Sequence, residues 1–215
     1  MFGDQKSQRA PPFRNWAHNP FYAAIEDLEL LPETAASLVK GVDLKYSSVS
    51  LVGIQNVDEW PIVATERGTY RVAPRPIAPI AIGDAMLVCQ ELGCELPDPA
   101  LVDAIYEQAN IWLDPIILKH DGTPKTMASP NAYSKHAALV LASLNKAAET
   151  TDIGPLALIV GTHKDIVSVN GKLGLYGWKT RNGRVIQPVF TGHGGYWIDY
   201  SQGVRPVKKI IVEDV

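Results

Sequence analysis

The sequence predicts an α+β protein, with N-terminal helices and a small antiparallel sheet followed by helices packed on a mostly antiparallel C-terminal sheet. Helix-start signals concentrate before residue 150, whereas the chain from residue 156 onward consists of short β-rich runs. Asn-Gly pairs at 170–171 and 182–183 are typical of hairpins that join antiparallel neighbours. Because helices and strands are segregated along the chain, the order favours α+β over an alternating α/β fold.

The N-terminal third predicts an arm, two short helices and a small sheet. Residues 1–18 are polar and contain prolines, so we expect an extended arm. Asn19-Pro20 is typical of an N-cap with Pro at the first helical position, and a second short helix is expected from Pro32 to Val39. Two or three antiparallel strands are predicted from β-rich runs at 48–54, 61–66 and 69–73.

Three longer helices and the C-terminal strands follow. A proline-rich connector at 73–80 leads into a helix that ends near Leu92, with Gly93 just beyond its C-cap. Asp98-Pro99 and Ser129-Pro130 each predict a helix start, and the second opens the longest helix, to about Ala147. Strands are then expected at 156–160, 165–169, 173–178, 185–190, 196–200 and 207–212.

Length and composition indicate a globular protein with a full core. The chain has 215 residues, of which 46% are hydrophobic and 20% charged, so the mainly helical region 19–150 and the β region 151–215 are expected to form one compact domain. No run of about 18 apolar residues occurs, so no membrane insertion is predicted. The N-terminus lacks the apolar core of a secretion signal, which predicts a cytoplasmic protein or a component of an exported or virion-like particle.

Charge and cysteines restrict the partners. Residues 161–215 carry eight Lys/Arg against four acids, a local +4, whereas the rest carries −7. Such a basic region suits a polymeric or anionic substrate, or is an ordinary solvated surface. No dense Lys/Arg run exists, so specific nucleic-acid binding is not expected. Cys89 and Cys94 cannot form a four-thiolate metal site and are expected to stay free.

Five residues are candidates for catalysis. His193 lies among three glycines, which permit close approach of a ligand. Asp199 would orient an imidazole, and Ser201 would be a nucleophile, although no G-x-S-x-G motif is present. His163 follows a buried strand, where a catalytic group and a surface turn are both compatible with the sequence. His136 lies on the apolar face of the longest helix, as a satisfied core residue or as part of the same cleft.

Binding residues are predicted in the same region. Arg205 would clamp an anionic group, or form a structural ion pair with Asp199. A stacking wall for sugar or peptide is predicted from four aromatic residues, Tyr176, Trp178, Tyr196 and Trp197.

No cofactor is predicted. Zinc stays possible, because His136, His163, His193 and Asp199 would supply enough ligands. However, the local spacings H-E-x-x-H and H-x-H are missing, as are the P-loop and dinucleotide-binding fingerprints.

Several motifs together resemble a family of uncharacterised bacterial proteins. They are G-x-H-K-D at 161–165, Y-G-W at 176–178, I-Q-P at 186–188 and D-Y-S-x-G-V-R at 199–205, with L-G-C-x-L-P and V-D-x-I-Y within 92–106. The resemblance covers about residues 68–208 and implies a shared fold and site. His163, His193, Asp199 and Arg205 keep the family pattern. Lys179 and Gln202 stand where the family favours His, so no metal role is expected at either position.

These residues predict a hydrolase that acts on a peptide- or glycan-containing polymer such as peptidoglycan. His193 would be the general base or a ligand, Asp199 its orienter, and His163 or His136 a second acid–base group. One alternative is a non-catalytic structural or assembly component of a phage-like particle, with assembly partners or a homo-oligomer. A third is binding of a small anionic ligand. The enzyme hypothesis requires at least two of His136, His163, His193 and Asp199 to lie within hydrogen-bond or shared-ligand reach in an open cleft.

Overall fold

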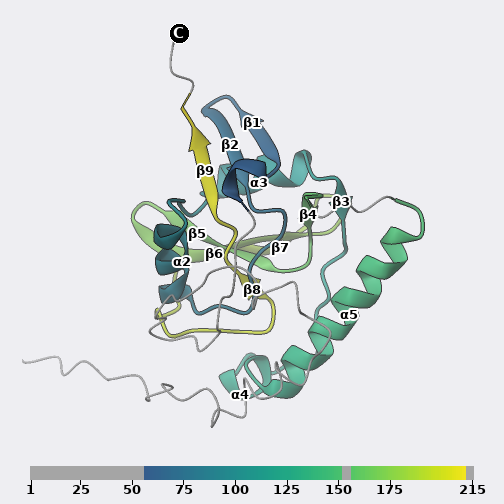
Figure 1. Ribbon diagram of the computed structural model, residues 1–215. Coiled ribbons are helices and arrows are strands. Elements are labelled where there is room, and N and C mark those ends of the chain that lie inside the picture. Colours follow the sequence, from purple (N-terminus) through teal and green to yellow (C-terminus); the bar gives the residue numbers. More distant parts are fainter. Residues whose placement is uncertain (1–55, 152–155, 212–215) are drawn as a thin grey trace, which may run out of the picture.

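The computed structural model describes residues 56–151 and 156–211, and its architecture is α+β, as predicted (Figure 1). The helical elements are η2 (Val57–Glu59), η3 (Ile82–Asp84), α2 (Ala85–Glu91), α3 (Pro99–Glu107), α4 (Pro124–Met127) and α5 (Pro130–Ala148). The strands are β1 (Ile62–Thr65), β2 (Gly68–Val72), β3 (Ile111–Trp112), β4 (Ile159–Val160), β5 (Lys164–Val169), β6 (Lys172–Lys179), β7 (Val185–Phe190), β8 (Gln202–Gly203) and β9 (Val207–Ile210).

The first sheet joins two distant parts of the chain. The predicted hairpin β1–β2 is present, and β9 pairs antiparallel with β2 to give the order β1-β2-β9. Figure 1 shows the yellow β9 beside the blue β1 and β2. Val72 lies opposite Val207, and both are fully buried. The end of the described chain therefore completes a sheet that begins near its start.

The second sheet has the order β7-β6-β5-β8. Asn170 and Gly171, both with positive φ (49° and 77°), make the tight turn between β5 and β6, which confirms the hairpin predicted there. Asn182-Gly183 lies in the turn between β6 and β7, as predicted. β8 is parallel to β5 and brings the C-terminal segment against the start of that strand.

Two short strands form a separate parallel pair, β3 with β4. By contrast, the prediction of a strand at 196–200 is wrong, because the structure has no strand there. The backbone there bonds to other elements, since the Ile82 and Gly83 amides donate to the Trp197 and Gly195 carbonyls and the Tyr200 amide donates to Met127. This segment is consequently an irregular connection between β7 and β8, and its side chains do not alternate between two sheet faces.

The helix boundaries follow the predicted capping signals. The Asp98 carboxylate accepts from the Leu101 amide at 2.8 Å, and the Ser129 hydroxyl accepts from the Ala132 amide at 3.2 Å. At the end of α2, Gly93 has φ +60°, and the Cys94 amide donates to the Cys89 carbonyl. That pair of features is a Schellman motif, in which glycine supplies the left-handed conformation.

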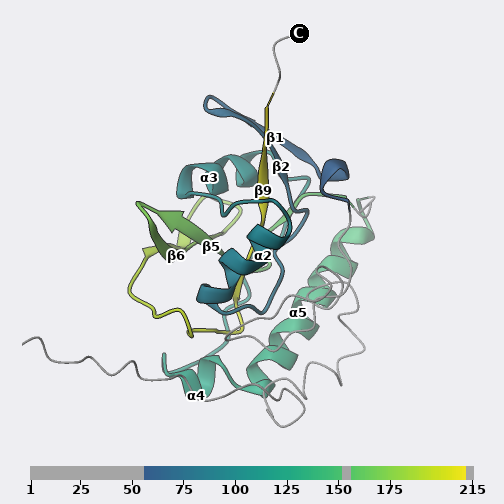
Figure 2. The same ribbon diagram turned by 60° about the vertical axis from the view of Figure 1, so that its left-hand side comes forward.

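Two apolar clusters hold the sheets and helices together. One packs α2 against the second sheet and includes Ile80, Val88 and Ile166. The other packs α3 between the two sheets and includes Ile105 and Val207. Helix α5 runs along the outside of the molecule in both ribbon views (Figures 1 and 2).

Several predicted features lie outside the described residues: the arm at 1–18, the helix that starts at Asn19-Pro20, the helix at 32–39, and the strand at 48–54. Within the described part of the chain, none of the helices has the length and apolar character needed to cross a bilayer.

Candidate functional site

The candidate site forms where β5 begins beside β8. Lys164 pairs with Gln202 across the two parallel strands, and the Lys164 amide donates to the Ser201 carbonyl at 2.6 Å. This pairing brings residues 163–165 next to residues 199–203. Two of the predicted sequence motifs, separated by more than thirty residues, therefore meet at one sheet edge.

A buried ion pair lies at the centre. Lys164 Nζ is 2.9 Å from Asp199 Oδ2, and both side chains are almost entirely buried. Asp199 Oδ1 accepts from both the amide and the hydroxyl of Ser201, at 2.8 and 2.7 Å. Burial alone would raise the pKa of Asp199, but the Lys164 charge and these hydrogen bonds outweigh it and hold the pKa below its ordinary value.

Two imidazoles with buried ring nitrogens lie close to each other near this ion pair. The rings of His136 on α5 and His163 before β5 are 5.0 Å apart between centroids, and His136 is also 5.0 Å from the Tyr200 ring. His136 Nε2 and His163 Nδ1 are buried and make no hydrogen bond with described residues. Burial lowers the pKa of His136 to about 4 and lowers that of His163 well below its ordinary value, so both rings are neutral.

The third imidazole, that of His193, lies nearer to solvent than the ring of His136. Its ring stacks on Trp197 at 4.0 Å with an angle of 3° between the planes, and the Phe190 ring meets it edge-on at 4.7 Å. Trp197 Nε1 in turn donates a long hydrogen bond, 3.4 Å, to Asp199 Oδ2. His193 is half-buried. Burial lowers its pKa, Asp199 opposes that change, and Lys164 adds to it.

The glycines beside His193 have a packing role. A Cβ on Gly192 would come within 2.7 Å of the Phe190 ring, and one on Gly194 within 2.8 Å of the Tyr196 ring. Only glycine lets both aromatic rings lie directly against the backbone on either side of the imidazole. The predicted close approach is thus made by the chain's own aromatic residues.

Only some of the predicted catalytic residues lie close to one another. His136 meets His163, and His193 reaches Asp199 through Trp197. Asp199 has no hydrogen bond to an imidazole among the described residues, so a Ser-His-Asp arrangement is not formed.

The nucleophile prediction for Ser201 is wrong. Its hydroxyl is fully buried and donates to Asp199, which leaves it closed to a substrate. Ser201 instead fixes the carboxylate that pairs with Lys164.

The anion-clamp prediction for Arg205 is also wrong, because the guanidinium is 1% exposed and each of its three nitrogen atoms already donates a hydrogen bond inside the protein. Nε donates to Asp165 at 3.1 Å, NH1 donates to the Ala73 and Pro74 carbonyls, and NH2 donates to the Ile159 carbonyl. Burial raises the pKa of Asp165, and Arg205 offsets part of that rise. Arg205 is a structural cross-link, although its partner is Asp165 and not Asp199.

The predicted aromatic wall does not exist as one surface. Trp178 is buried, with its indole N–H bonded to the Gly161 carbonyl. Tyr176 lies toward α3, where its hydroxyl donates to Asp103. Tyr196 is exposed, and Trp197 carries the stacked imidazole.

Sequence reasoning missed Lys164, Tyr200 and Phe190. The first four residues of β5 are all buried, so alternation cannot identify the lysine that faces Asp199. Tyr200 contacts His136 and accepts a hydrogen bond from the Leu118 amide, which are long-range contacts without a local signal. Phe190 could have been found, because it lies three residues before His193 at the end of an expected strand.

The described residues contain no group of three or more His, Cys, Asp or Glu arranged to hold a metal ion. Lys179 and Gln202, at which no metal role was expected, both contact other parts of the protein, and Lys179 pairs with Asp103. Gln202 donates to the Ile80 and Trp197 carbonyls. These two side chains therefore serve as structural contacts.

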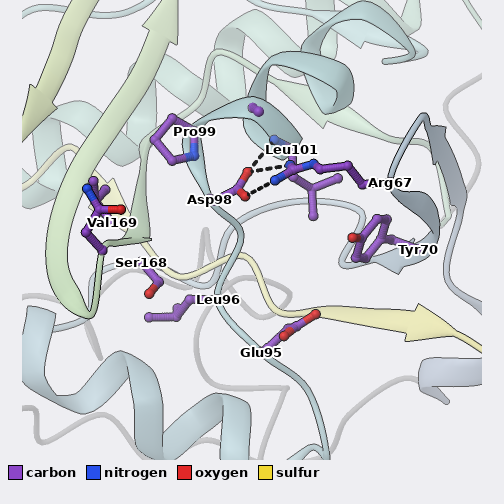
Figure 3. A pocket seen from close by; sticks show the side chains of 11 residues that line it. Arg67, Tyr70, Glu95, Leu96, Asp98, Pro99, Leu101, Ser168 and Val169 are labelled. Atoms are coloured by element: carbon purple, nitrogen blue, oxygen red, sulfur yellow. Dashed lines mark hydrogen bonds and ion pairs between the residues drawn. The ribbon is translucent and has the colours of Figure 1, made fainter.

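A cavity of about 590 Å³ lies at a different place, between the β1–β2 turn, the start of α3 and the end of β5. Figure 3 shows Arg67 and Asp98 joined by two hydrogen bonds at its margin, with Leu96 and Leu101 among its apolar lining. None of its lining residues belongs to the predicted site. The charge of the Arg67 guanidinium in this cavity is already neutralised by the carboxylate of Asp98, the residue that caps α3.

No protein-family model, curated protein or solved structure matches this chain.

Proposed function

We propose that this protein is a hydrolase acting on a peptide- or glycan-containing polymer, with His193 as its general acid–base. The observation that carries the proposal is the clamped, half-exposed imidazole of His193 beside the buried Lys164–Asp199 pair. A catalytic imidazole must be fixed in orientation and open to substrate. His193 meets both requirements, whereas His136 is enclosed.

The lowered pKa of His193 keeps its imidazole neutral near pH 7, which is the form that accepts a proton. In the proposed reaction, His193 takes a proton from the water that attacks the scissile bond. The same proton then passes to the leaving group. The Lys164–Asp199 pair places a fixed dipole next to the ring at no reorganisation cost during the reaction.

The supporting residues take roles that differ from a hydrolytic triad. Asp199 acts on His193 through Trp197, whose N–H contacts the carboxylate and whose face carries the imidazole. His163 is the proposed second acid–base group, because it adjoins Lys164 in the chain and its side chain as a whole is only half-buried, although its Nδ1 is buried. His136 would support it from behind, at 5.0 Å.

Zymography on purified cell walls tests the proposal. Wild-type protein should clear the gel, and His193→Ala should lower clearing by about 10²- to 10⁴-fold, the usual contribution of a general acid–base. His120→Ala is the matched control, because His120 is exposed, accepts a hydrogen bond from the Gly122 amide of its own turn, and meets the site only as a ring 6.3 Å from that of Tyr200. Equal clearing by wild type and His193→Ala would remove His193 from the mechanism. No clearing by any of the three proteins would count against hydrolysis of this substrate.

A second candidate function is a non-catalytic assembly component of a particle. It is favoured by β7, an edge strand whose Val185, Val189 and Phe190 side chains are exposed. An absence of clearing in the zymogram, combined with concentration-dependent self-association in light scattering, would support this candidate. A monomer that clears cell walls would exclude it.

A further inference from the structure

The loop that follows β7 presents two aromatic rings to solvent beside His193. Phe190 is 45% exposed and Tyr196 is 65% exposed, although large aromatic side chains are normally buried. Both belong to the segment 190–197, which runs along the outside of the molecule in Figures 1 and 2 as the yellow-green connection from β7 toward β8. We refer to this segment as the aromatic loop.

Backbone hydrogen bonds to η3 anchor the aromatic loop. The Gly83 amide donates to the Gly195 carbonyl at 2.7 Å, and the Ile82 amide donates to the Trp197 carbonyl at 3.1 Å. The rings of Phe190 and Tyr196 rest against glycine backbone, and His193, which lies between them in the chain, stacks on Trp197. A platform of this kind loses little conformational entropy when a ligand stacks on it.

The charge of the region restricts the ligand. Residues 185–198 contain no Asp, Glu, Lys or Arg. The two charges that act on His193, those of Lys164 and Asp199, are buried and neutralise each other. The aromatic loop itself therefore supplies neither the cation that an anionic ligand or nucleic acid would need nor the carboxylate that a cationic ligand would need.

The backbone next to the loop argues against an extended peptide. A peptide that adds to an edge strand depends on main-chain hydrogen bonds and on pockets for alternate side chains. Pro188 in the middle of β7 has no N–H to donate, and proline is one of the usual protections of a sheet edge. Exposed flat rings instead suit a ligand that is itself a ring with an apolar face.

We propose that the aromatic loop binds an uncharged glycan, with its pyranose rings stacked on Phe190 and Tyr196. The Thr191 and Tyr196 hydroxyls, both on exposed residues, would meet the sugar hydroxyls. The inference rests on the proposed hydrolase in one respect, since it names glycan as the substrate class of the same site. A sugar ring on Phe190 lies next to the His193 imidazole, where the glycosidic bond would be cleaved.

Binding of a chitin hexasaccharide, followed by isothermal titration calorimetry, tests the inference without reference to turnover. Phe190→Ala and Tyr196→Ala should each weaken binding by about 5- to 10-fold, the usual effect of losing one stacked ring. Val185→Ala is the matched control, because Val185 is 39% exposed and lies at the opposite end of β7. Circular dichroism of each variant verifies that the fold is retained. A second pair of variants, Phe190→Leu and Tyr196→Leu, keeps the apolar bulk but not the flat ring. These variants should bind the hexasaccharide as weakly as the alanine variants.

The outcomes separate this inference from the proposed function. Hexasaccharide binding that depends on both rings, in a protein that clears no cell wall, supports the glycan site and refutes the hydrolase. Clearing of cell walls with no hexasaccharide binding, or with binding of free stem peptides alone, refutes the glycan site and leaves the hydrolase standing. Binding that is unchanged in both ring variants also overturns the glycan site.

Discussion

At the residue scale, the three histidines of the site differ because their surroundings differ. His136 is 1% exposed, and its nearest charges are Asp199 and Lys164, which act in opposite directions. Burial is the largest influence, so the charged form is penalised and the ring stays neutral in the fold. His193 has a similar pair of charges nearby but remains open to solvent. The protonation of His136 therefore affects the stability of the fold, whereas His193 is the imidazole that can react with a substrate.

We expect His136 to make the protein less stable in mild acid. Its pKa is 6.5 in an unfolded chain and about 4 in the fold, so acidification between these values protonates the unfolded state first. The free energy of unfolding is then complete above pH 6.5 and falls toward pH 4, by up to about 1.4 kcal/mol per pH unit for one such group. Urea denaturation of wild type and His136→Gln at pH 7, 6 and 5 measures the difference.

The comparison needs a histidine that lacks this environment. His120→Gln, which changes an exposed imidazole, is the matched control. Parallel stability curves for wild type and His136→Gln would show that the buried ring does not control acid stability.

At the element scale, single buried side chains connect segments that are distant in the chain. Arg205, between β8 and β9, bonds to Asp165 on β5, to Ile159 on β4 and to the connector carbonyls of Ala73 and Pro74. Short strands such as β4 and β8 have few ladder bonds of their own. The guanidinium, with its fixed fork of donors, supplies cross-links that these two-residue strands lack.

Replacement of Arg205 should therefore be costly. Arg205→Ala leaves the Asp165 carboxylate and three carbonyls without their partner in the interior, and we expect a loss of about 3–5 kcal/mol in the free energy of unfolding. Arg205→Lys keeps a charge but not the fork, so an intermediate loss is expected. Chemical denaturation followed by circular dichroism measures both.

An exposed ion pair provides the control. Lys208 and Asp58 lie 3.6 Å apart with both side chains open to solvent, so Lys208→Ala should change stability by at most about 1 kcal/mol. Equal losses for Arg205→Ala and Lys208→Ala would contradict the cross-linking role.

At the scale of the whole molecule, the order of the chain and the order of the sheets differ. β9 completes the sheet that β1 and β2 begin, and isolated bridges join Ile77 to Val204 and Glu95 to Val207. In the described part of the chain, strands of the expected regions 19–150 and 151–215 therefore pair with each other, and the two regions share sheets. This arrangement predicts that both regions unfold together.

Hydrogen exchange tests this cooperativity. Val207→Ala removes a fully buried side chain from β9, and we expect it to speed exchange by a similar factor in peptides from β2 and in peptides from β6. Val189→Ala, on the exposed edge strand β7, should have little effect on either. Faster exchange confined to β2 and its neighbours would indicate two independent units.

Local features were predictable because they depend on residues a few positions apart. Asp98-Pro99 and Ser129-Pro130 mark helix starts through bonds to amides three residues later, and Asn170-Gly171 makes a turn from its own backbone conformation. The α+β class followed from the order of such signals. The prominence of His193 among glycines was likewise visible in the chain.

Only the tertiary structure decided which distant residues meet. The pairing of Lys164 with Asp199, the cross-link from Arg205 to Asp165, and the loop in place of a strand at 196–200 all depend on partners 35 or more residues away, or on other elements. Such contacts form when long loops close, and no local periodicity records which closure buries the most apolar surface and satisfies the most polar groups. The sequence by itself therefore determined the helix starts, the hairpin turns and the glycine-flanked histidine, whereas packing determined that Arg205 and Ser201 are structural and that His193 faces solvent.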